Sequence, residues 1–388
     1  MKDFLYYAPT KVFFGKDKQK EIGDIVKEYG YKTVMLQYGQ ESRKKSGLYD
    51  EVVSALTDKG IKVIDFGGVE PNPKVSFVRE AIKVAKENNI ELILAVGGGS
   101  AIDSAKSTAA GALYDGDVWD FPSQKATPKA SLDVACILTI AAAGSEMSSS
   151  AVLTNTELNI KKGFNSSFNR CKFAIMNPEL TFTVSKYQTS CGIVDIMAHT
   201  MERYFTVAEP TDLTDRIAEA ILKAVISAGK VLMENPCDYD ARANMMWASS
   251  LSHNDLTGCG RENALCVHQL EHALSGEFDF IAHGAGLAVL FPAWARFIYK
   301  ENPSRFAQFA RRVWDVDEDD DLKASLLGIE KMEEFFKEIE MPLSLREFGI
   351  ENVSERLADL CTFSKNRVIK SYVDLDYDKI KQIFESCY

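Results

Sequence analysis

In the first half of the chain, short apolar runs alternate with longer stretches in which apolar residues recur every three or four positions. The short runs have the length and β-branched content of buried strands, and the longer stretches have the period of helices. Because a helix follows each strand, we expect a parallel sheet with its ligand site beyond the carboxyl ends of the strands. The predicted strands are 33–39, 61–68 and 91–100, and the predicted helices are 48–60 and 75–89.

After about residue 185 the strand pattern disappears and only helical periodicity remains. Helices are predicted at 192–205, 212–236, 304–314 and 329–342, and the acidic run 315–321 is expected to be a solvated turn at a helix start. The predicted fold class is therefore an α/β domain with a parallel sheet (1–185) followed by an all-α domain (186–388), and the cleft between two such domains is the default ligand site.

Composition limits the possible partners and the compartment. The 388 residues include 45 Lys and Arg against 56 Asp and Glu, so the net charge of −11 disfavours nucleic acid and anionic membrane surfaces. The eight cysteines contain no CxxC pair, which is typical of reduced thiols. The chain has no signal-peptide core and no apolar run of the roughly 18 residues that a membrane span needs. We therefore expect a cytoplasmic protein.

A glycine-rich segment, AVGGGSAIDSAK (95–106), runs from a predicted strand directly into a helix. Glycines let the backbone approach a bulky anion, and the helix N-terminus offers N–H groups to phosphates. The alternative is merely a tight strand-to-helix turn. Because Ile102 stands where the third glycine of GxGxxG would fall, the segment lacks the usual dinucleotide fingerprint. The candidate phosphate-binding residues are Gly97, Gly98, Gly99 and Ser100.

A second candidate anion site follows the first predicted strand, in YGQESRKKSG (38–47). Here Gly39 and Ser42 could face a ribose, and the three basic residues 43–45 could attract a 2′-phosphate that Glu41 would repel. A solvated basic loop explains this composition equally well.

Two pairs of potential metal ligands have helical spacing. Asp195 and His199 stand four residues apart, as do His268 and His272, and residues at this spacing share a helix face. Nitrogen and oxygen donors from two such helices suit Zn²⁺ or Fe²⁺. Spacing alone would select these four residues and leave His283 and His253 unexplained.

Several stretches in order along the chain resemble the iron-containing alcohol dehydrogenase family, in particular its butanol dehydrogenase and NADPH-dependent aldehyde reductase branch. The resemblance implies a dehydroquinate synthase-like fold, with a dinucleotide-binding α/β domain and a helical metal-binding domain, and a homodimer. The matching stretches are 9–15, 68–106, 137–155, 177–185, 192–206, 268–294 and 341–350.

The resemblance changes the proposed metal ligands. One Asp and three His hold the metal in the family, and the matching positions here are Asp195, His199, His268 and His283, with a turn through Gly276 returning His283 to the site. His272 then lies near the substrate, and we interpret it as the catalytic residue that relays the alcohol proton.

The resemblance also implies cofactor contacts and a cofactor preference. The loop from Gly97 to Ser100 with Asp103 matches the pyrophosphate segment, and Thr139 and Lys161, or else Lys162, match positions near the cofactor. Relatives in this branch usually read ATGSE where this chain has AAGSE (142–146), so one hydroxyl is lost. NAD-preferring relatives tend to carry an acidic residue at the position of Gly39, and its absence slightly favours NADP(H) over NAD(H).

The predicted function is metal-dependent interconversion of primary alcohols, such as butanol, with their aldehydes, using NAD(P)(H) and one divalent Fe²⁺ or Zn²⁺. One alternative shares the fold: a glycerol dehydrogenase-like polyol enzyme or a cyclising synthase of the dehydroquinate type. A second is a metal-dependent hydrolase with Glu202 or Glu271 as its base, and a third is a non-catalytic binding protein. The hydrolase leaves the glycine loop without a purpose.

Overall fold

The computed structural model describes residues 1–39, 47–206, 210–262 and 264–388, and these residues form two compact units. The α/β unit is Tyr7–Thr183, and the helical unit is Val184–Tyr388 together with Met1–Tyr6. The first six residues belong to the helical unit, whereas the predicted division placed them in the α/β domain. One contact that holds them there is the hydrogen bond from the Lys2 N–H to the Gly260 carbonyl (2.9 Å). The candidate residue Ser42 lies outside the described residues, as do Glu41 and the basic residues 43–45.

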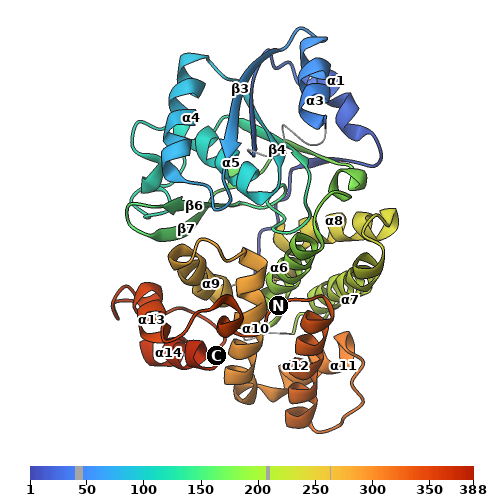
Figure 1. Cartoon of the computed structure of the whole chain (residues 1–388), viewed down its shortest axis with the longest axis vertical. Coiled ribbons are helices and arrows are strands. Elements are labelled where there is room, and N and C mark those ends of the chain that lie inside the picture. Colours follow the sequence, from blue (N-terminus) through green and yellow to red (C-terminus); the bar gives the residue numbers. More distant parts are fainter. Residues whose placement is uncertain (40–46, 207–209, 263) are drawn as a thin grey trace. The chain divides into compact units, whose positions relative to one another are not determined.

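The α/β unit contains a six-stranded sheet in which every neighbouring pair of strands is parallel, as predicted (Figure 1). Its strand order is β1-β8-β5-β4-β2-β3, and β6 and β7 form a separate antiparallel pair. The strands predicted from the apolar runs correspond to β2, β3 and β4. The strands are β1 (Lys11–Phe14), β2 (Thr33–Gly39), β3 (Lys62–Val69), β4 (Leu92–Gly97), β5 (Asp133–Leu138), β6 (Ser150–Asn155), β7 (Ile160–Asn165) and β8 (Phe173–Met176).

Helices cover both faces of this sheet, which explains why its central strands are continuously apolar. One face, with Val34, Leu36 and Leu94, packs in a core with residues of α1 and α3. The opposite face contacts α5, where the Gln37 side chain donates to Thr108 Oγ1 (3.1 Å). Among the described residues of this unit, the α-helices are α1 (Ile22–Glu28), α3 (Leu48–Thr57), α4 (Val75–Glu87) and α5 (Gly99–Ala112).

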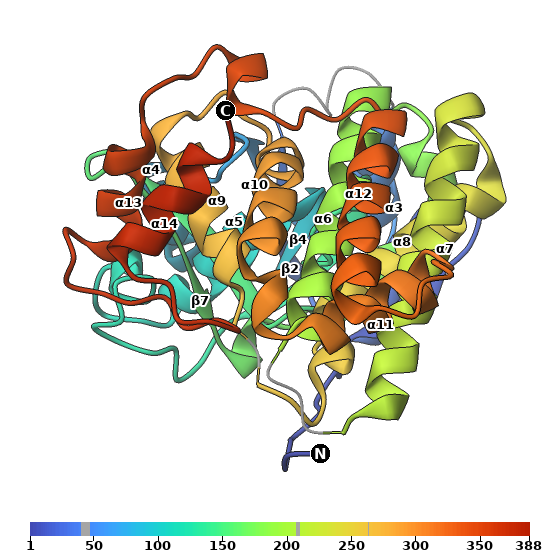
Figure 2. The ribbon, with the colours of Figure 1, turned by 90° about the horizontal axis from the view of Figure 1, so that it is seen from below.

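The described residues of the helical unit contain nine α-helices, and α10 packs against both α6 and α9 (Figure 2). The acidic run is a helix start, as predicted: Asp320 caps α12 and accepts from the Lys323 N–H (2.9 Å). The helices are α6 (Lys186–Tyr204), α7 (Asp212–Glu234), α8 (Tyr239–His253), α9 (Cys266–Glu277), α10 (His283–Ile298), α11 (Pro303–Val313), α12 (Asp321–Glu338), α13 (Ser354–Thr362) and α14 (Tyr377–Glu385). Within the described ranges, none of the helices combines the length and apolarity that a membrane span requires.

Candidate functional site

The first predicted ligand pair lies in the middle of α6. Asp195 and His199 face the same side of this helix, and their side chains are almost completely buried. The Nδ1 atom of His199 lies 3.1 Å from Oδ1 of Asp195. The four-residue spacing therefore brings a carboxylate and an imidazole together inside the helical unit.

Two further imidazoles reach the same carboxylate from other helices. His268 in α9 places Nε2 3.6 Å from Asp195 Oδ1, and His283, the first residue of α10, places Nε2 3.8 Å from it. The predicted turn through Gly276 is wrong, because α9 continues through Glu277 and the connection is 278–282. Nitrogen atoms from three helices thus converge on one oxygen atom.

Close packing of α10 on α6 accounts for the position of His283. Gly284 follows this histidine, and a Cβ atom at Gly284 would overlap the backbone carbonyl of Cys191 in α6. A backbone atom cannot rotate away as the tip of a side chain can. The glycine therefore lets the first turn of α10 approach α6 closely enough for His283 to reach Asp195.

Two buried carboxylates orient the imidazoles from behind. Glu202 is paired with Nδ1 of His268 and also accepts from the His268 backbone N–H (3.2 Å), while Glu271 is paired with Nδ1 of His283. Both carboxylates are at most 2% exposed. Such pairs fix the ring orientation and leave Nε2 to act as a ligand.

The orienting roles of Glu202 and Glu271 are absent from the sequence predictions, which considered them only as bases of a hydrolase. Both carboxylates are occupied by imidazoles in the structure, which removes the support for that role. One signal existed: Glu202 lies three residues after His199, and Glu271 lies three residues after His268, so each shares a helix face with a histidine.

The donor atoms fit a metal ion. Asp195 Oδ1, His199 Nδ1 and His268 Nε2 are buried and have no hydrogen-bond partner among the described residues. A buried polar atom without a partner costs about 1–3 kcal/mol, so three of them in one place need a compensating interaction. These atoms also lie within 4.8 Å of one another, and carboxylate oxygen with imidazole nitrogen suits Zn²⁺ or Fe²⁺.

The electrostatics of these side chains agree with this donor set. Burial alone would raise the pKa of Asp195, but the imidazoles of His199 and its neighbours outweigh burial and hold this pKa well below its usual range. Burial lowers the pKa of His199 to about 3, so its ring is neutral. Burial would lower the pKa of His268, but the carboxylates of Glu202 and Asp195 raise it to about 9. A metal ion would therefore displace a proton from His268.

His272 lies beside this set of atoms. It is partly exposed on α9, and its ring centroid lies 5.6 Å from that of His283. Its ring nitrogen groups with Glu271 and His283, but of these two histidines it is His283 whose Nε2 lies 3.8 Å from Asp195 Oδ1. The geometry thus supports His283 over His272 as the fourth ligand and leaves His272 next to the site.

His253, which spacing left unexplained, packs behind His199. The centroids of the two rings are 4.0 Å apart, and His253 Nδ1 lies 3.2 Å from an Arg203 guanidinium nitrogen. Burial holds the pKa of His253 well below its usual value. His253 is therefore a neutral packing partner of a proposed ligand.

In the α/β unit, the glycine loop joins β4 to α5 with no intervening residues beyond the glycines. Gly97 ends β4, Gly98 is the N-cap of α5 and Gly99 begins the helix. A Cβ atom at Gly98 would overlap Ile140 Cγ2, and one at Gly99 would lie 3.2 Å from Ala143 Cβ. These contacts support the alternative that the glycines serve a tight turn. Phosphate binding also stays possible, because the N–H groups in the first turn of a helix, where Ser100 lies, have no partners within the helix.

Asp103 and Lys106 hold the segment that follows β5 against α5. Asp103 accepts from Ser145 Oγ (2.5 Å) and from the Val152 N–H (3.0 Å). Lys106 is fully buried and donates to the carbonyl oxygens of Ser145 (2.6 Å) and Ser150 (2.8 Å). Burial raises the pKa of Asp103 in spite of Lys106. Both side chains support the loop from within the unit, and contact between Asp103 and the cofactor stays a prediction.

The remaining candidate cofactor residues occupy two places in this unit. Gly39 ends β2 and Thr139 follows β5, where its N–H donates to the Gly97 carbonyl (3.1 Å), so both lie with the loop at the carboxyl edge of the sheet. Lys161 and Lys162 lie instead on β7, opposite Thr154 and Leu153 of β6. The roles of all these residues in cofactor binding stay predictions.

A glycine loop at the carboxyl edge of a parallel sheet and a buried carboxylate–imidazole cluster in a helical unit together fit the class of enzymes that bind a nucleotide and a divalent metal. The chain belongs to the iron-containing alcohol dehydrogenase family. The family model "Iron-containing alcohol dehydrogenase" matches residues 9–178, and the model of the C-terminal part of the Fe-containing alcohol dehydrogenase family matches residues 189–388. The family resemblance is thereby confirmed.

Individual relatives agree with this assignment. The chain is 41% identical to NADH-dependent butanol dehydrogenase A of Clostridium acetobutylicum over 100% of both chains. It is 32% identical to the NADPH-dependent aldehyde reductase YqhD of Escherichia coli over 91% of both. The crystal structure of NADH-dependent butanol dehydrogenase A from Thermotoga maritima matches with a TM-score of 0.96 at 36% identity, covering 100% of this chain and 99% of that one. The chain is therefore an NAD(P)-dependent alcohol dehydrogenase with the predicted fold class.

Proposed function

We propose that this enzyme interconverts primary alcohols such as butanol with their aldehydes, with a single divalent Fe²⁺ or Zn²⁺ held by Asp195, His199, His268 and His283. The convergence of three imidazole nitrogens on the buried Asp195 oxygen carries this proposal. The named activities of the butanol dehydrogenases and of the aldehyde reductase among the relatives support the substrate class.

The residues of the chain contribute orientation and proton transfer. A divalent cation in such a site supplies Lewis acidity toward a substrate oxygen, and a nicotinamide supplies the hydride. Glu202 and Glu271 hold the rings of His268 and His283 in the orientation that points Nε2 at Asp195. His272, partly exposed beside His283, relays the alcohol proton to solvent.

For the cofactor, we propose that the enzyme accepts both NADH and NADPH, and the slight preference for NADP(H) stays a prediction. Gly39 ends β2 without an acidic side chain that would repel a 2′-phosphate. Against a preference for NADP(H), the relatives at 41% and 43% identity are named NADH-dependent. The ratio of kcat/KM for NADPH to kcat/KM for NADH, measured with one aldehyde, shows which of the two cofactors the enzyme prefers.

We further propose a homodimer in the cytoplasm. The first residues of the chain expose several large apolar side chains, among them Phe4 (54% exposed) and Leu5 (91% exposed). Exposed apolar groups gathered in one segment are typical of a contact surface. Sedimentation equilibrium of the wild type against the Phe4→Ser/Leu5→Ser variant tests this proposal. A wild-type monomer would contradict it.

The function itself is tested by initial rates. Protein reloaded with Fe²⁺ or Zn²⁺ is mixed with NADH or NADPH and a series of straight-chain aldehydes, and the oxidation of the cofactor is followed by absorbance. We expect turnover with butyraldehyde, and no turnover in a His199→Ala variant that still binds the cofactor. If no aldehyde oxidises either cofactor, the proposal fails. A synthase that uses NAD only transiently would give no net absorbance change.

A further inference from the structure

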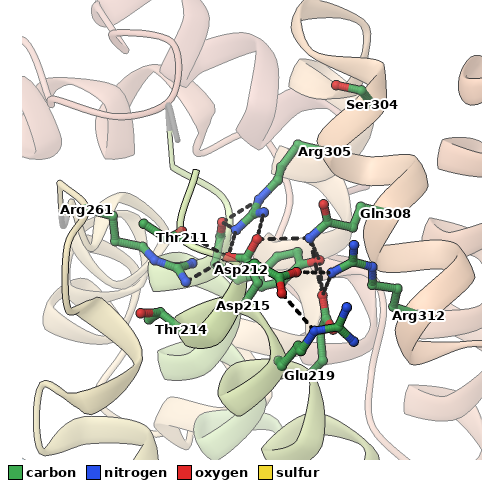
Figure 3. A network of polar contacts seen from close by, with 12 residues as sticks. Thr211, Asp212, Thr214, Asp215, Glu219, Arg261, Ser304, Arg305, Gln308 and Arg312 are labelled. Carbon is green, nitrogen blue, oxygen red and sulfur yellow. Dashed lines mark hydrogen bonds and ion pairs between the residues drawn. The ribbon is translucent and has the colours of Figure 1, made fainter. Parts of the chain in front are cut away.

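The C-terminal end of α6 is held by two buried arginines from elsewhere in the helical unit. Figure 3 shows both of them, Arg261 and Arg305. The last carbonyl oxygens of a helix have no partner within the helix. In α6, the Arg203 carbonyl accepts from Arg261 Nη1 (3.0 Å), and the Tyr204 carbonyl accepts from Arg305 Nε (2.9 Å) and Nη2 (2.7 Å). These arginines cap the helix that carries two of the proposed metal ligands.

Asp215 of α7 joins the two arginines. Its Oδ1 lies 2.7 Å from Arg261 Nη2, and its two oxygens lie 2.6 and 2.7 Å from Arg305 Nη1 and Nη2. All three residues are at most 7% exposed. We call Asp215, Arg261 and Arg305 the Asp215 cluster. Because one carboxylate balances two buried guanidinium groups, its loss would leave both arginines without this partner.

Further contacts lock the side chain of Tyr204 to the Asp215 cluster. The Arg305 guanidinium carbon lies 3.8 Å from the centre of the Tyr204 ring, and the Tyr204 hydroxyl donates to Glu219 (2.9 Å). Gln308 of α11 donates to Asp215 Oδ2 (3.0 Å), as Figure 3 shows. Both the backbone and the side chain of the last residue of α6 are therefore fixed by α7 and α11.

The last turn of α6 also contains the carboxylate that orients a proposed ligand. Glu202, which holds His268, directly precedes the two capped residues. The side chain of Arg203 ties the same turn to the ligand-bearing part of the helix, since Arg203 Nη1 donates to the His199 carbonyl (2.8 Å). A shift of this turn would therefore move Glu202 relative to His268.

We propose that the Asp215 cluster positions the metal centre by fixing the last turn of α6. This inference rests on the proposed ligand set. Asp215 and Arg305 are positioning residues, because they act through the backbone of α6 and through Glu202. Buried ion pairs often add no more stability than apolar side chains of similar size, which is consistent with a role in geometry.

The test uses Co²⁺ on the full-length protein, with two readouts: the dissociation constant of Co²⁺ and the visible absorption of the bound ion, which reports its ligand geometry. Asp215→Asn removes the charge without changing the shape of the side chain. Asp212→Asn is the matched control, because Asp212 lies in the first turn of the same helix with its side chain 65% exposed. We expect Asp215→Asn to alter the spectrum and to weaken Co²⁺ binding by up to about 10-fold, the lower end of the range for a group that contacts a ligand directly, because Asp215 acts through Arg305 and α6.

Asp212→Asn should match the wild type in both readouts. Wild-type affinity and spectrum in folded Asp215→Asn would overturn the inference. If Asp215→Asn is unfolded by circular dichroism, Arg305→Lys takes its place, because lysine keeps the charge but cannot contact the Tyr204 carbonyl with two nitrogens. Asp195→Ala separates the two proposals: retention of Co²⁺ in this variant would refute the ligand set itself. Loss of Co²⁺ there, with wild-type behaviour in the cluster variants, would refute only the positioning role.

Discussion

The proposed metal centre of the helical unit and the glycine loop of the α/β unit are built from different groups. The metal centre uses side chains of three helices, from Asp195 to His283, and three of its donor atoms are buried without a hydrogen-bond partner among the described residues. The glycine loop uses backbone within a few consecutive residues, and the polar side chains beneath it, Asp103 and Lys106, bind their own unit. A site made of side chains depends on tertiary packing, whereas a site made of backbone depends on the absence of side chains.

The largest effect on metal binding is expected when a proposed ligand, His283, is compared with its neighbour His272. A structural zinc site contributes about 10–16 kcal/mol through four ligands, so loss of one ligand should weaken metal binding by roughly a few hundredfold. We expect this loss in His283→Ala, whereas His272→Ala should keep the metal and lose activity. Metal content after dialysis and steady-state rates measure both. Loss of metal in His272→Ala with retention in His283→Ala would reverse the assignment.

A smaller effect is expected from the carboxylate behind His283. Glu271→Gln keeps the size of the side chain but weakens its pairing with Nδ1, and loss of such a partner typically costs about 10–100-fold in metal affinity. Glu277→Gln on the same helix is the control, because Glu277 pairs with the exposed Arg356. Competition with a chelator gives both affinities. Equal affinities in the two variants would show that Glu271 does not orient the ligand.

The smallest effect is expected from a substitution in the glycine loop, which should change cofactor affinity and leave metal affinity unchanged. Gly98→Ala places a methyl group against Ile140, and such overpacking costs about 1–3 kcal/mol of folding stability. Because the loop backbone must move to relieve the overlap, we expect cofactor affinity to fall as well. In Gly98→Ala/Ile140→Ala the nearest remaining contact, with Cβ of residue 140, is 3.7 Å, which is ordinary van der Waals distance. Fluorescence titration with NADPH distinguishes two explanations. Full recovery in the double variant would mean that Gly98 serves packing, and continued weak binding would mean that a bare backbone is needed for the phosphates.

The contrast between a site built from distant side chains and a site built from consecutive residues also explains which features the sequence could predict. The glycine loop and the Asp195–His199 pair are local, so strand length, helix period and spacing locate them correctly. The choice between His272 and His283 is not local. It depends on where α9 ends and on the close approach that Gly284 permits, and helix spacing contains neither. Similarly, the edge position of β1 beside β8 depends on pairing across more than 150 residues, which no local pattern encodes.

The most direct test of the proposed ligand set is an anomalous difference map from zinc-loaded crystals, with data collected on both sides of the zinc absorption edge. We predict one peak about 2.0–2.2 Å from a carboxylate oxygen of Asp195 and from one nitrogen each of His199, His268 and His283, with His272 outside this distance. A peak bound by Glu271, His272 and His283, and away from Asp195, would contradict the account.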